Sequence, residues 1–177
     1  MRIISGALKG RRIKPPAGLP VRPTTDMAKE SLFNILMSRD FTDDHVLDLF
    51  AGTAGVSLEF ISRGCHSAAA VEQNQMCIDF IHHLKDKFQL DNLDIVPSNV
   101  FRFIPRCQEK FDIVFADPPY DLDELETLPD LVFAEEMINA DGIFILEHDK
   151  RYHFNHHPHF SDHRRYGKVE FSFFKPI

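Results

Sequence analysis

Residues 46–55 read Val-Leu-Asp-Leu-Phe-Ala-Gly-Thr-Ala-Gly, a short apolar run that passes directly into small residues. The apolar half is typical of a strand that is buried on both faces of a sheet. The small residues let the backbone approach a ligand closely, and a helix that begins there presents free N–H groups. A strand that ends in such a loop is typical of the first unit of a doubly wound α/β sheet.

The rest of the chain alternates in the same way. Further buried strands are expected at 68–71, 93–96, 113–116 and 142–146. Helical periodicity lies between them, best over 76–88, and an earlier amphipathic helix is expected over 26–39. Residues 160–175, with Gly167 near the middle, read as a final hairpin. We therefore predict a Rossmann-like α/β fold, a mostly parallel seven-stranded sheet with an antiparallel C-terminal hairpin.

Composition excludes several classes of protein. Apolar residues make up 44% and charged residues 27% of the 177 residues, which indicates one globular core. No apolar run is longer than four residues, so no membrane span is expected, and the first residues lack the apolar segment that is typical of a secretory signal. Three widely spaced cysteines and a loop-like histidine cluster over 153–163 predict no disulfide framework and no metal site, and favour the cytoplasm.

The charge is unevenly distributed. The net charge is −7, yet residues 1–25 hold six basic side chains and no acidic one. The segment 150–177 is also basic. This distribution suits a protein whose basic ends bind a polyanion while its acidic body repels it. We divide the chain into a basic N-terminal β arm, 1–25, with short strands near Ile3 and Ile13, and one domain, 26–177.

The first loop indicates a nucleoside ligand. Glu72 closes the second expected strand twenty residues after Gly52, where a carboxylate accepts hydrogen bonds from ribose hydroxyls. The full G-x-G-x-x-G turn for a pyrophosphate is missing, and Asp48 favours a cationic ligand, so S-adenosylmethionine is the expected cofactor. Asn99 suits either the adenine amine or a helix N-cap. The expected cofactor residues are Asp48, Phe50, Ala51, Gly52, Thr53, Gly55, Glu72, Gln73, Ser98 and Asn99.

The reaction centre is expected directly after the fourth strand. There the chain reads Asp117-Pro118-Pro119-Tyr120, and two prolines hold it in a rigid turn. Tyr120 offers a stacking platform for a planar base, and Asp117 and the Pro118 carbonyl offer two acceptors for an amino group. Such acceptors localise the lone pair of a nucleobase amine and stabilise the charge that develops on methyl attack. Asp117 is also a candidate general base.

These motifs together resemble a known family. Arg22-Pro23-Thr24-Thr25-Asp26, Leu32-Phe33-Asn34, Asp48 to Gly52, Ser62-Arg63-Gly64 and Asp117 to Tyr120 occur in the order of the RsmD-type enzymes. Those are the bacterial 16S rRNA guanine-N2 methyltransferases, and the resemblance covers nearly the whole chain. It implies methyl transfer to one guanine of small-subunit rRNA, within the subunit or an assembly intermediate, by a monomer. The expected RNA-binding residues are Arg11, Arg12, Lys14, Arg22, Thr24 and Thr25.

The chain departs from the family pattern in two places. Ala54 stands where the family loop has its second glycine, so a positive φ there would cost about 1 kcal/mol and weaken cofactor binding. Met27 and Lys29 stand where the family commonly has arginine, which removes a possible phosphate or base contact.

Two other functions remain open on sequence alone. A DNA adenine-N6 methyltransferase shares the Asp117 to Tyr120 turn but usually needs a separate recognition domain. A catalytically inactive RNA-binding assembly factor would keep the fold and lose cofactor binding through Ala54. A glutamine-N5 protein methyltransferase usually has Asn where Asp117 stands.

Overall fold

The computed structural model describes residues 1–19 and 25–177. Its helices are α1 (Asp26–Ile35), α2 (Gly55–Ser62), α3 (Gln75–Phe88), α4 (Val100–Phe103) and α5 (Leu128–Ala134), with 3-10 turns at Ile104–Arg106 and Leu125–Thr127. Its strands are β1 (His45–Leu49), β2 (Ser67–Glu72), β3 (Leu93–Pro97), β4 (Phe111–Ala116), β5 (Ile138–His148), β6 (Phe160–Tyr166) and β7 (Val169–Phe174).

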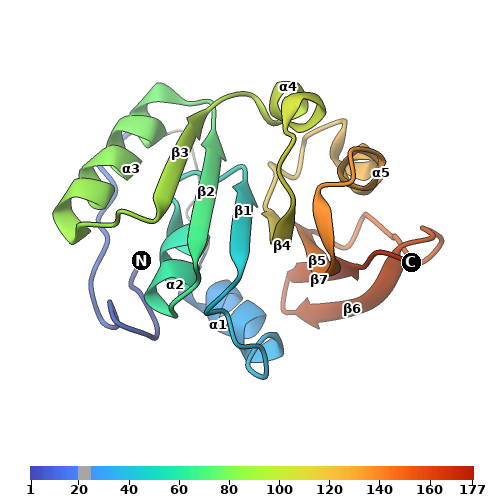
Figure 1. The fold of residues 1–177 in the computed structure, drawn as a ribbon, viewed down its shortest axis with the longest axis horizontal. Coiled ribbons are helices and arrows are strands. Elements are labelled where there is room, and N and C mark those ends of the chain that lie inside the picture. The colour runs from blue at the N-terminus through green and yellow to red at the C-terminus, as the bar shows by residue number, and fades with distance from the viewer. Residues whose placement is uncertain (20–24) are drawn as a thin grey trace.

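The strands form one sheet in the order β3-β2-β1-β4-β5-β7-β6 (Figure 1). Neighbours from β3 to β5 pair in parallel, whereas β7 pairs antiparallel with both β5 and β6. The predicted mostly parallel sheet with an antiparallel C-terminal hairpin is confirmed. Strand order reverses between β1 and β4, which places a ligand-binding crevice at the carboxyl ends of these two strands.

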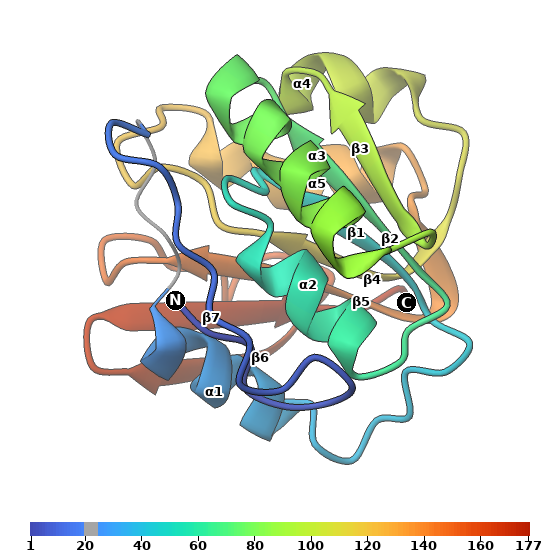
Figure 2. The same cartoon turned by 90° about the vertical axis from the view of Figure 1, so that its left-hand side faces the viewer.

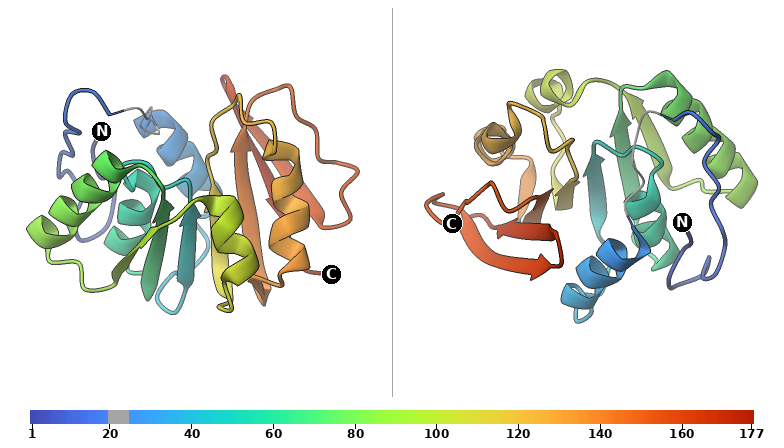
Figure 3. Two further views of the ribbon diagram at one scale, coloured as in Figure 1. Left: turned by 90° about the horizontal axis from the view of Figure 1, so that it is seen from above. Right: turned by 180° about the vertical axis from the view of Figure 1, so that it is seen from behind.

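Helices cover both faces of the sheet (Figure 3). One face carries α1, α2 and α3, whose apolar side chains join a core that also includes Ile3 and Ile13 of the N-terminal arm. The other face carries α4 and α5 over a second core. Strands β1 and β4 contribute to both cores, so their backbones are held rigidly from either side.

The N-terminal arm lies along α2 (Figure 2). Its predicted strands are reduced to one isolated bridge between Arg2 and Arg12. Gly6 adopts φ +79°, and a Cβ there would overlap the carbonyl oxygen of Ser62. This close approach explains why the chain has glycine at position 6. Ile3 is fully buried, so the first part of the arm is an integral layer of the fold.

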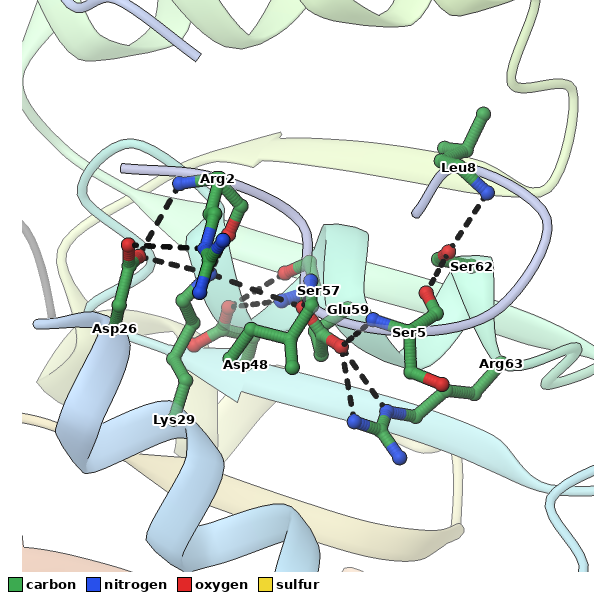
Figure 4. Close-up of polar contacts among 11 residues, drawn as sticks. Arg2, Ser5, Leu8, Asp26, Lys29, Asp48, Ser57, Glu59, Ser62 and Arg63 are labelled. Carbon is green, nitrogen blue, oxygen red and sulfur yellow. Dashed lines mark hydrogen bonds and ion pairs between the residues drawn. The ribbon is translucent and has the colours of Figure 1, made fainter. Parts of the chain in front are cut away.

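The buried ion pair between Lys29 of α1 and Glu59 of α2 also binds the N-terminal arm (Figure 4). Glu59 of α2 is fully buried and accepts hydrogen bonds from the backbone N–H groups of Ile4 (2.9 Å) and Ser5 (3.0 Å). Arg63 donates to the same carboxylate (3.1 Å), and the Lys29 ammonium lies 3.8 Å from it. Both oxygens of Glu59 therefore face donors or a cation, as burial of a charge requires.

Several element boundaries differ from the sequence predictions. The helix expected over 26–39 ends at Ile35, because the chain turns there and brings Phe41 against Phe33 (ring centroids 6.3 Å apart). Strand β3 lies at the edge of the sheet and is half-exposed, so it is not buried on both faces. Strand β5 begins at Ile138 instead of 142, since an irregularity in its pairing with β4 adds residues.

None of the helices in the described ranges is long and apolar enough to cross a membrane.

Candidate active site

A cavity of about 940 Å³ opens at the point where the strand order reverses. It is lined by Thr25, Ala28, Phe50, Ala51, Gly52, Thr53, Val71, Glu72, Gln73, Asn74, Ser98, Val100, Asp117, Pro118, Pro119, Tyr120, Asp121, Glu147, Arg151, Lys168 and Val169. The loop after β1, the end of β2 and the turn after β4 therefore meet in one cavity, although they are far apart in sequence. Seven of the ten predicted cofactor residues and all four predicted reaction-centre residues lie in this lining.

The loop after β1 has an unusual backbone. Phe50, Gly52 and Ala54 all have positive φ, at 63°, 56° and 56°. Positive φ is uncommon for a residue with a side chain, and such strain concentrates at ligand-binding sites. The loop is fixed by hydrogen bonds from the Ala51 N–H to the Val71 carbonyl (3.0 Å) and from the Ala54 N–H back to Ala51 (2.7 Å). Ala54 thus occupies the left-handed conformation that the second glycine of the family loop would accommodate.

Glu72 links this loop to the end of β2. Its carboxylate accepts hydrogen bonds from the N–H groups of Gly52 (2.8 Å), Gln73 (2.8 Å) and Asn74 (2.7 Å). Each carboxylate oxygen has two lone pairs, so Glu72 retains capacity to accept from a ribose hydroxyl at the cavity wall. The carboxylate therefore orients the loop as well as lining the cavity.

Three predicted cofactor residues lie outside the cavity lining. Asp48 is buried, and its carboxylate accepts from the backbone N–H (3.1 Å) and hydroxyl (2.5 Å) of Ser57. Gly55 begins α2 beneath the side chain of Met1. Asn99 caps α4, with its side-chain oxygen accepting from the Phe101 N–H (3.0 Å). These residues support the loops of the cavity from behind.

Burial raises the pKa of Asp48 to about 7, and the nearby negative charges of Asp117 and Glu72 act in the same direction. The negative potential around the β1 loop therefore comes mainly from Asp117 and Glu72, because the raised pKa leaves Asp48 only partly ionised near pH 7. Such a site favours a cationic ligand over a diphosphate. The sequence analysis favoured a cationic ligand for the same reason, from Asp48 alone.

The turn after β4 is held by two side chains that follow β5. The Tyr120 carbonyl accepts hydrogen bonds from Arg151 Nη2 (2.6 Å) and from the Tyr152 hydroxyl (3.2 Å). Pro118 is buried and Pro119 is exposed. The Tyr120 ring is half-buried and its hydroxyl lies 3.5 Å from Glu147 Oε1, so the ring leans into the cavity instead of standing free in solvent. Asp117 and Pro118 both line the cavity at this rigid turn.

The sequence analysis missed functional candidates from β5 and the C-terminal hairpin. Glu147 near the end of β5, Arg151 after it and Lys168 at the hairpin turn all line the cavity. Glu147 directly follows the predicted strand 142–146, so the rule that ligands bind at carboxyl ends of strands would have singled it out. Arg151 and Lys168 place positive charge on the rim beside the reaction centre.

The predicted RNA-binding residues are only partly brought to the cavity. Thr25 lines it and also caps α1, its hydroxyl accepting from the Ala28 N–H (3.1 Å). Arg11, Arg12 and Lys14 are exposed on the arm and lie outside the cavity lining. The predictions for Arg22 and Thr24 fall outside the described residues.

Three histidines of the cluster over 153–163 contact other side chains of the fold. His157 pairs with Asp130 (3.2 Å), His163 with Glu170 (2.8 Å), and His159 stacks on Phe133. Within residues 1–19 and 25–177, no group of three or more His, Cys, Asp or Glu side chains is arranged to hold a metal ion.

Fold and site together define a class. A seven-stranded sheet of this topology, with a ligand cavity at the β1–β4 crevice and an Asp-Pro-Pro-Tyr turn, is that of S-adenosylmethionine-dependent methyltransferases. Residues 1–175 match the model of the family described as Conserved hypothetical protein 95, and the chain belongs to this family.

The relatives are consistent with that assignment. The Ribosomal RNA small subunit methyltransferase D of Escherichia coli (strain K12) is 33% identical over 147 residues, which cover 83% of this chain and 74% of that protein. The solved structure of the Thermus thermophilus protein TTHA0928 has a TM-score of 0.86 at 28% identity and covers 99% of both chains. The protein SMU.776, solved in complex with SAH, has a TM-score of 0.69 at 16% identity, which shows the fold alone. The resemblance to RsmD-type enzymes is confirmed.

Proposed function

We propose that this protein transfers a methyl group from S-adenosylmethionine to the N2 amino group of one guanine in 16S rRNA, within the small ribosomal subunit or an assembly intermediate. The observation that carries the proposal is the shared cavity. The residues of the Asp117 to Tyr120 turn line the same space as the Gly52 loop and Glu72. The relatives named small subunit methyltransferase D support rRNA as the substrate.

The residues present fit S-adenosylmethionine. Val71 and Val100 give apolar walls for a base, Oε2 of Glu72 can accept from a ribose hydroxyl, and Ala51 and Gly52 allow close backbone approach. The surrounding carboxylates suit a ligand that carries both an ammonium and a sulfonium group. When bound, this cofactor supplies a methyl group activated by the positive sulfur.

The chain's own residues then act on the amine. Asp117 and the Pro118 carbonyl accept hydrogen bonds from the two N2 hydrogens, which localises the nitrogen lone pair and stabilises the positive charge that develops there. As the amino nitrogen forms its bond to the methyl carbon, the carbon–sulfur bond breaks. One N2 proton passes to the Asp117 carboxylate and from there to solvent. The target base leaves its stack to reach the turn.

The basic residues serve RNA positioning in this proposal. Arg151 and Lys168 on the rim contact phosphates next to the target, and Arg11, Arg12 and Lys14 of the arm hold phosphates further away. We further propose that the predicted division into a basic arm, 1–25, and a methyltransferase domain, 26–177, describes these two roles. The cysteines within the described ranges are free thiols, which suits a cytoplasmic protein, and we expect a monomer.

The inactive assembly factor is the second candidate, because Ala54 adopts the left-handed conformation in which a glycine would be unstrained. Methyl transfer distinguishes the two. Labelled S-adenosylmethionine is incubated with small ribosomal subunits from a strain lacking the enzyme, with bare 16S rRNA and plasmid DNA in parallel, and product nucleosides are identified by mass spectrometry. We expect N2-methylguanosine at one site. Label in DNA alone would establish the adenine-N6 alternative, and tight RNA binding without label would establish the assembly factor.

A further inference from the structure

Glu147 is a buried carboxyl group at the reaction centre, and the described residues provide a partner for only one of its two oxygens. Its side chain lines the cavity with Asp117 and Tyr120, and the residue is only 4% exposed. One oxygen, Oε1, lies 3.5 Å from the Tyr120 hydroxyl. The other, Oε2, has no hydrogen-bond partner in the described part of the chain. An unpartnered buried oxygen is costly and rare in folded proteins, so its persistence at a ligand cavity points to a partner that arrives with the ligand.

The protein environment favours the neutral form of this group. Burial raises the pKa of Glu147 to about 9, and the negative charge of Asp117 acts in the same direction. A neutral carboxyl has one O–H donor and one carbonyl acceptor. The Tyr120 hydroxyl oxygen can accept a hydrogen bond from the O–H of the neutral Glu147 carboxyl group, because a hydroxyl accepts as well as donates. The carbonyl oxygen is then left to face the cavity as an uncharged acceptor.

The acceptors at the turn match one kind of base. Guanine presents two adjacent donors on its Watson–Crick edge, N1–H and the N2 amino group. Adenine presents an N6 donor beside N1, which is an acceptor. Asp117 and the Pro118 carbonyl are acceptors for an amino group, and a further acceptor beside them meets a hydrogen on guanine and a lone pair on adenine. The further acceptor and adenine N1 would face each other without a proton between them and would repel, so binding of adenine is disfavoured.

We propose that Glu147 is a specificity-determining positioning residue, whose unpartnered Oε2 accepts a hydrogen bond from the N1–H of the target guanine while Asp117 holds the neighbouring amino group. The inference rests on the proposed function and deepens it, since it names how the site selects guanine. Glu147 takes no part in the proton balance of the reaction. Its effect is to place N2 on the Asp117 side of the cavity.

Two substitutions separate this role from a structural one. Glu147→Gln keeps an uncharged acceptor and a donor in the same shape, so it should retain at least about one third of wild-type kcat/KM for small ribosomal subunits. Glu147→Leu fills a similar volume without an acceptor and should lower that kcat/KM about 10- to 100-fold, with an unchanged S-adenosylmethionine Kd. Glu170→Gln is the matched control, because Glu170 is also buried but pairs with His163 outside the cavity lining.

A base analogue tests the contact itself. 2-Aminopurine keeps the 2-amino group and lacks N1–H, so it is placed at the modified position of RNA that is reconstituted into subunits. The wild type and Glu147→Gln should prefer guanine over 2-aminopurine by about 10-fold or more, and Glu147→Leu should lose most of that preference. The same preference in Glu147→Leu as in the wild type, or an unchanged kcat/KM in that variant, would overturn the inference.

Failure of the proposed function has a different signature. If wild-type protein labels no subunit, or if the product is N6-methyladenosine, the guanine reaction itself is wrong and the N1–H contact falls with it. If wild-type protein produces N2-methylguanosine and the Glu147 variants behave as the wild type does, only the inference about Glu147 is overturned.

Discussion

Two buried glutamates of this fold, Glu59 and Glu147, differ in what surrounds them. Glu59 lies under the N-terminal arm, where two backbone N–H groups, Arg63 and Lys29 face its carboxylate (Figure 4). Glu147 lies at the cavity, with a long contact to Tyr120 and one oxygen without a partner in the described residues. The first carboxylate stabilises the fold, and the second is available to a ligand. Burial alone therefore does not distinguish structure from function, whereas the completeness of the hydrogen bonding does.

The largest expected effect lies beside Glu147. Asp117→Ala removes the carboxylate that accepts both a hydrogen bond and, later, a proton from the target amine. Methyl transfer to small subunits should therefore fall by about 10³-fold or more. RNA affinity should stay within about twofold, because phosphate contacts supply most of it. Transfer of labelled methyl groups and RNA binding by filter retention are measured together. Asp123→Ala, exposed and outside the cavity lining, serves as control, and an active Asp117→Ala protein would refute the mechanism.

The next effect concerns stability at Glu59. Glu59→Gln leaves the fully buried Lys29 ammonium without its nearest compensating charge and should lower the free energy of unfolding by about 3 to 5 kcal/mol. Asp26, 3.9 Å from the Lys29 ammonium, limits the loss. Urea unfolding gives the value, with Glu30→Gln on the exposed face of α1 as control. A decrease below about 1 kcal/mol would mean that the arm is not anchored by this pair.

Glu147→Gln should change stability in a pH-dependent way. The folded-state pKa of Glu147 is raised from 4.5 to about 9, so the folded protein binds the extra proton and wild-type stability declines as pH rises through this window. Relative to the wild type, the Gln variant should gain up to roughly 1.4 kcal/mol for each pH unit. Asp117 and Tyr120 face Glu147, and Glu72, Asp121, Arg151 and Lys168 share its cavity. These groups are the same in both proteins, so their contributions to the difference in stability cancel to first order. A difference that stays constant from about pH 5 to about pH 9 would contradict the neutral carboxyl group of Glu147.

A smaller effect is expected from the arm. Arg12→Ala combined with Lys14→Ala removes two exposed cations outside the cavity lining and should weaken RNA binding several-fold. The slope of log K against log salt should fall by about 0.7 to 0.9 for each phosphate that the variant no longer neutralises. Lys110→Ala, an exposed cation paired with Glu136, is the control. An unchanged slope would mean that Arg12 and Lys14 contact no RNA phosphate.

The smallest effect is expected at Ala54. Ala54→Gly relieves about 1 kcal/mol of backbone strain at φ 56°. It also removes a fully buried methyl group, and the lost burial costs about 0.8 kcal/mol. The net change in unfolding free energy should stay below about 0.5 kcal/mol, and the S-adenosylmethionine Kd should change less than about threefold. Calorimetric titration measures the Kd. Binding that appears only in the glycine variant would favour the inactive assembly factor.

Local patterns in the sequence determined much of this protein. Periodicity predicted the parallel strands, α3 and the final hairpin. Buried positions of a helix or strand are apolar and recur at a fixed spacing within a short stretch of sequence, so they can be recognised without the rest of the fold. Turn residues located the loop at Gly52 and the rigid turn at Asp117, since glycine and proline set what the backbone can do wherever they occur. The family followed from the order of these motifs.

Only the tertiary structure decided which charged groups are satisfied. Asp48 bonds to Ser57 behind the cavity, Glu59 receives the arm, and Glu147 keeps an oxygen at the reaction centre that no described residue satisfies. A single sequence position does not reveal these differences, because the partners of a buried carboxylate come from elements that are distant in the chain. Burial, hydrogen bonding and neighbouring charge act together in space, and they set the protonation and the role of each group.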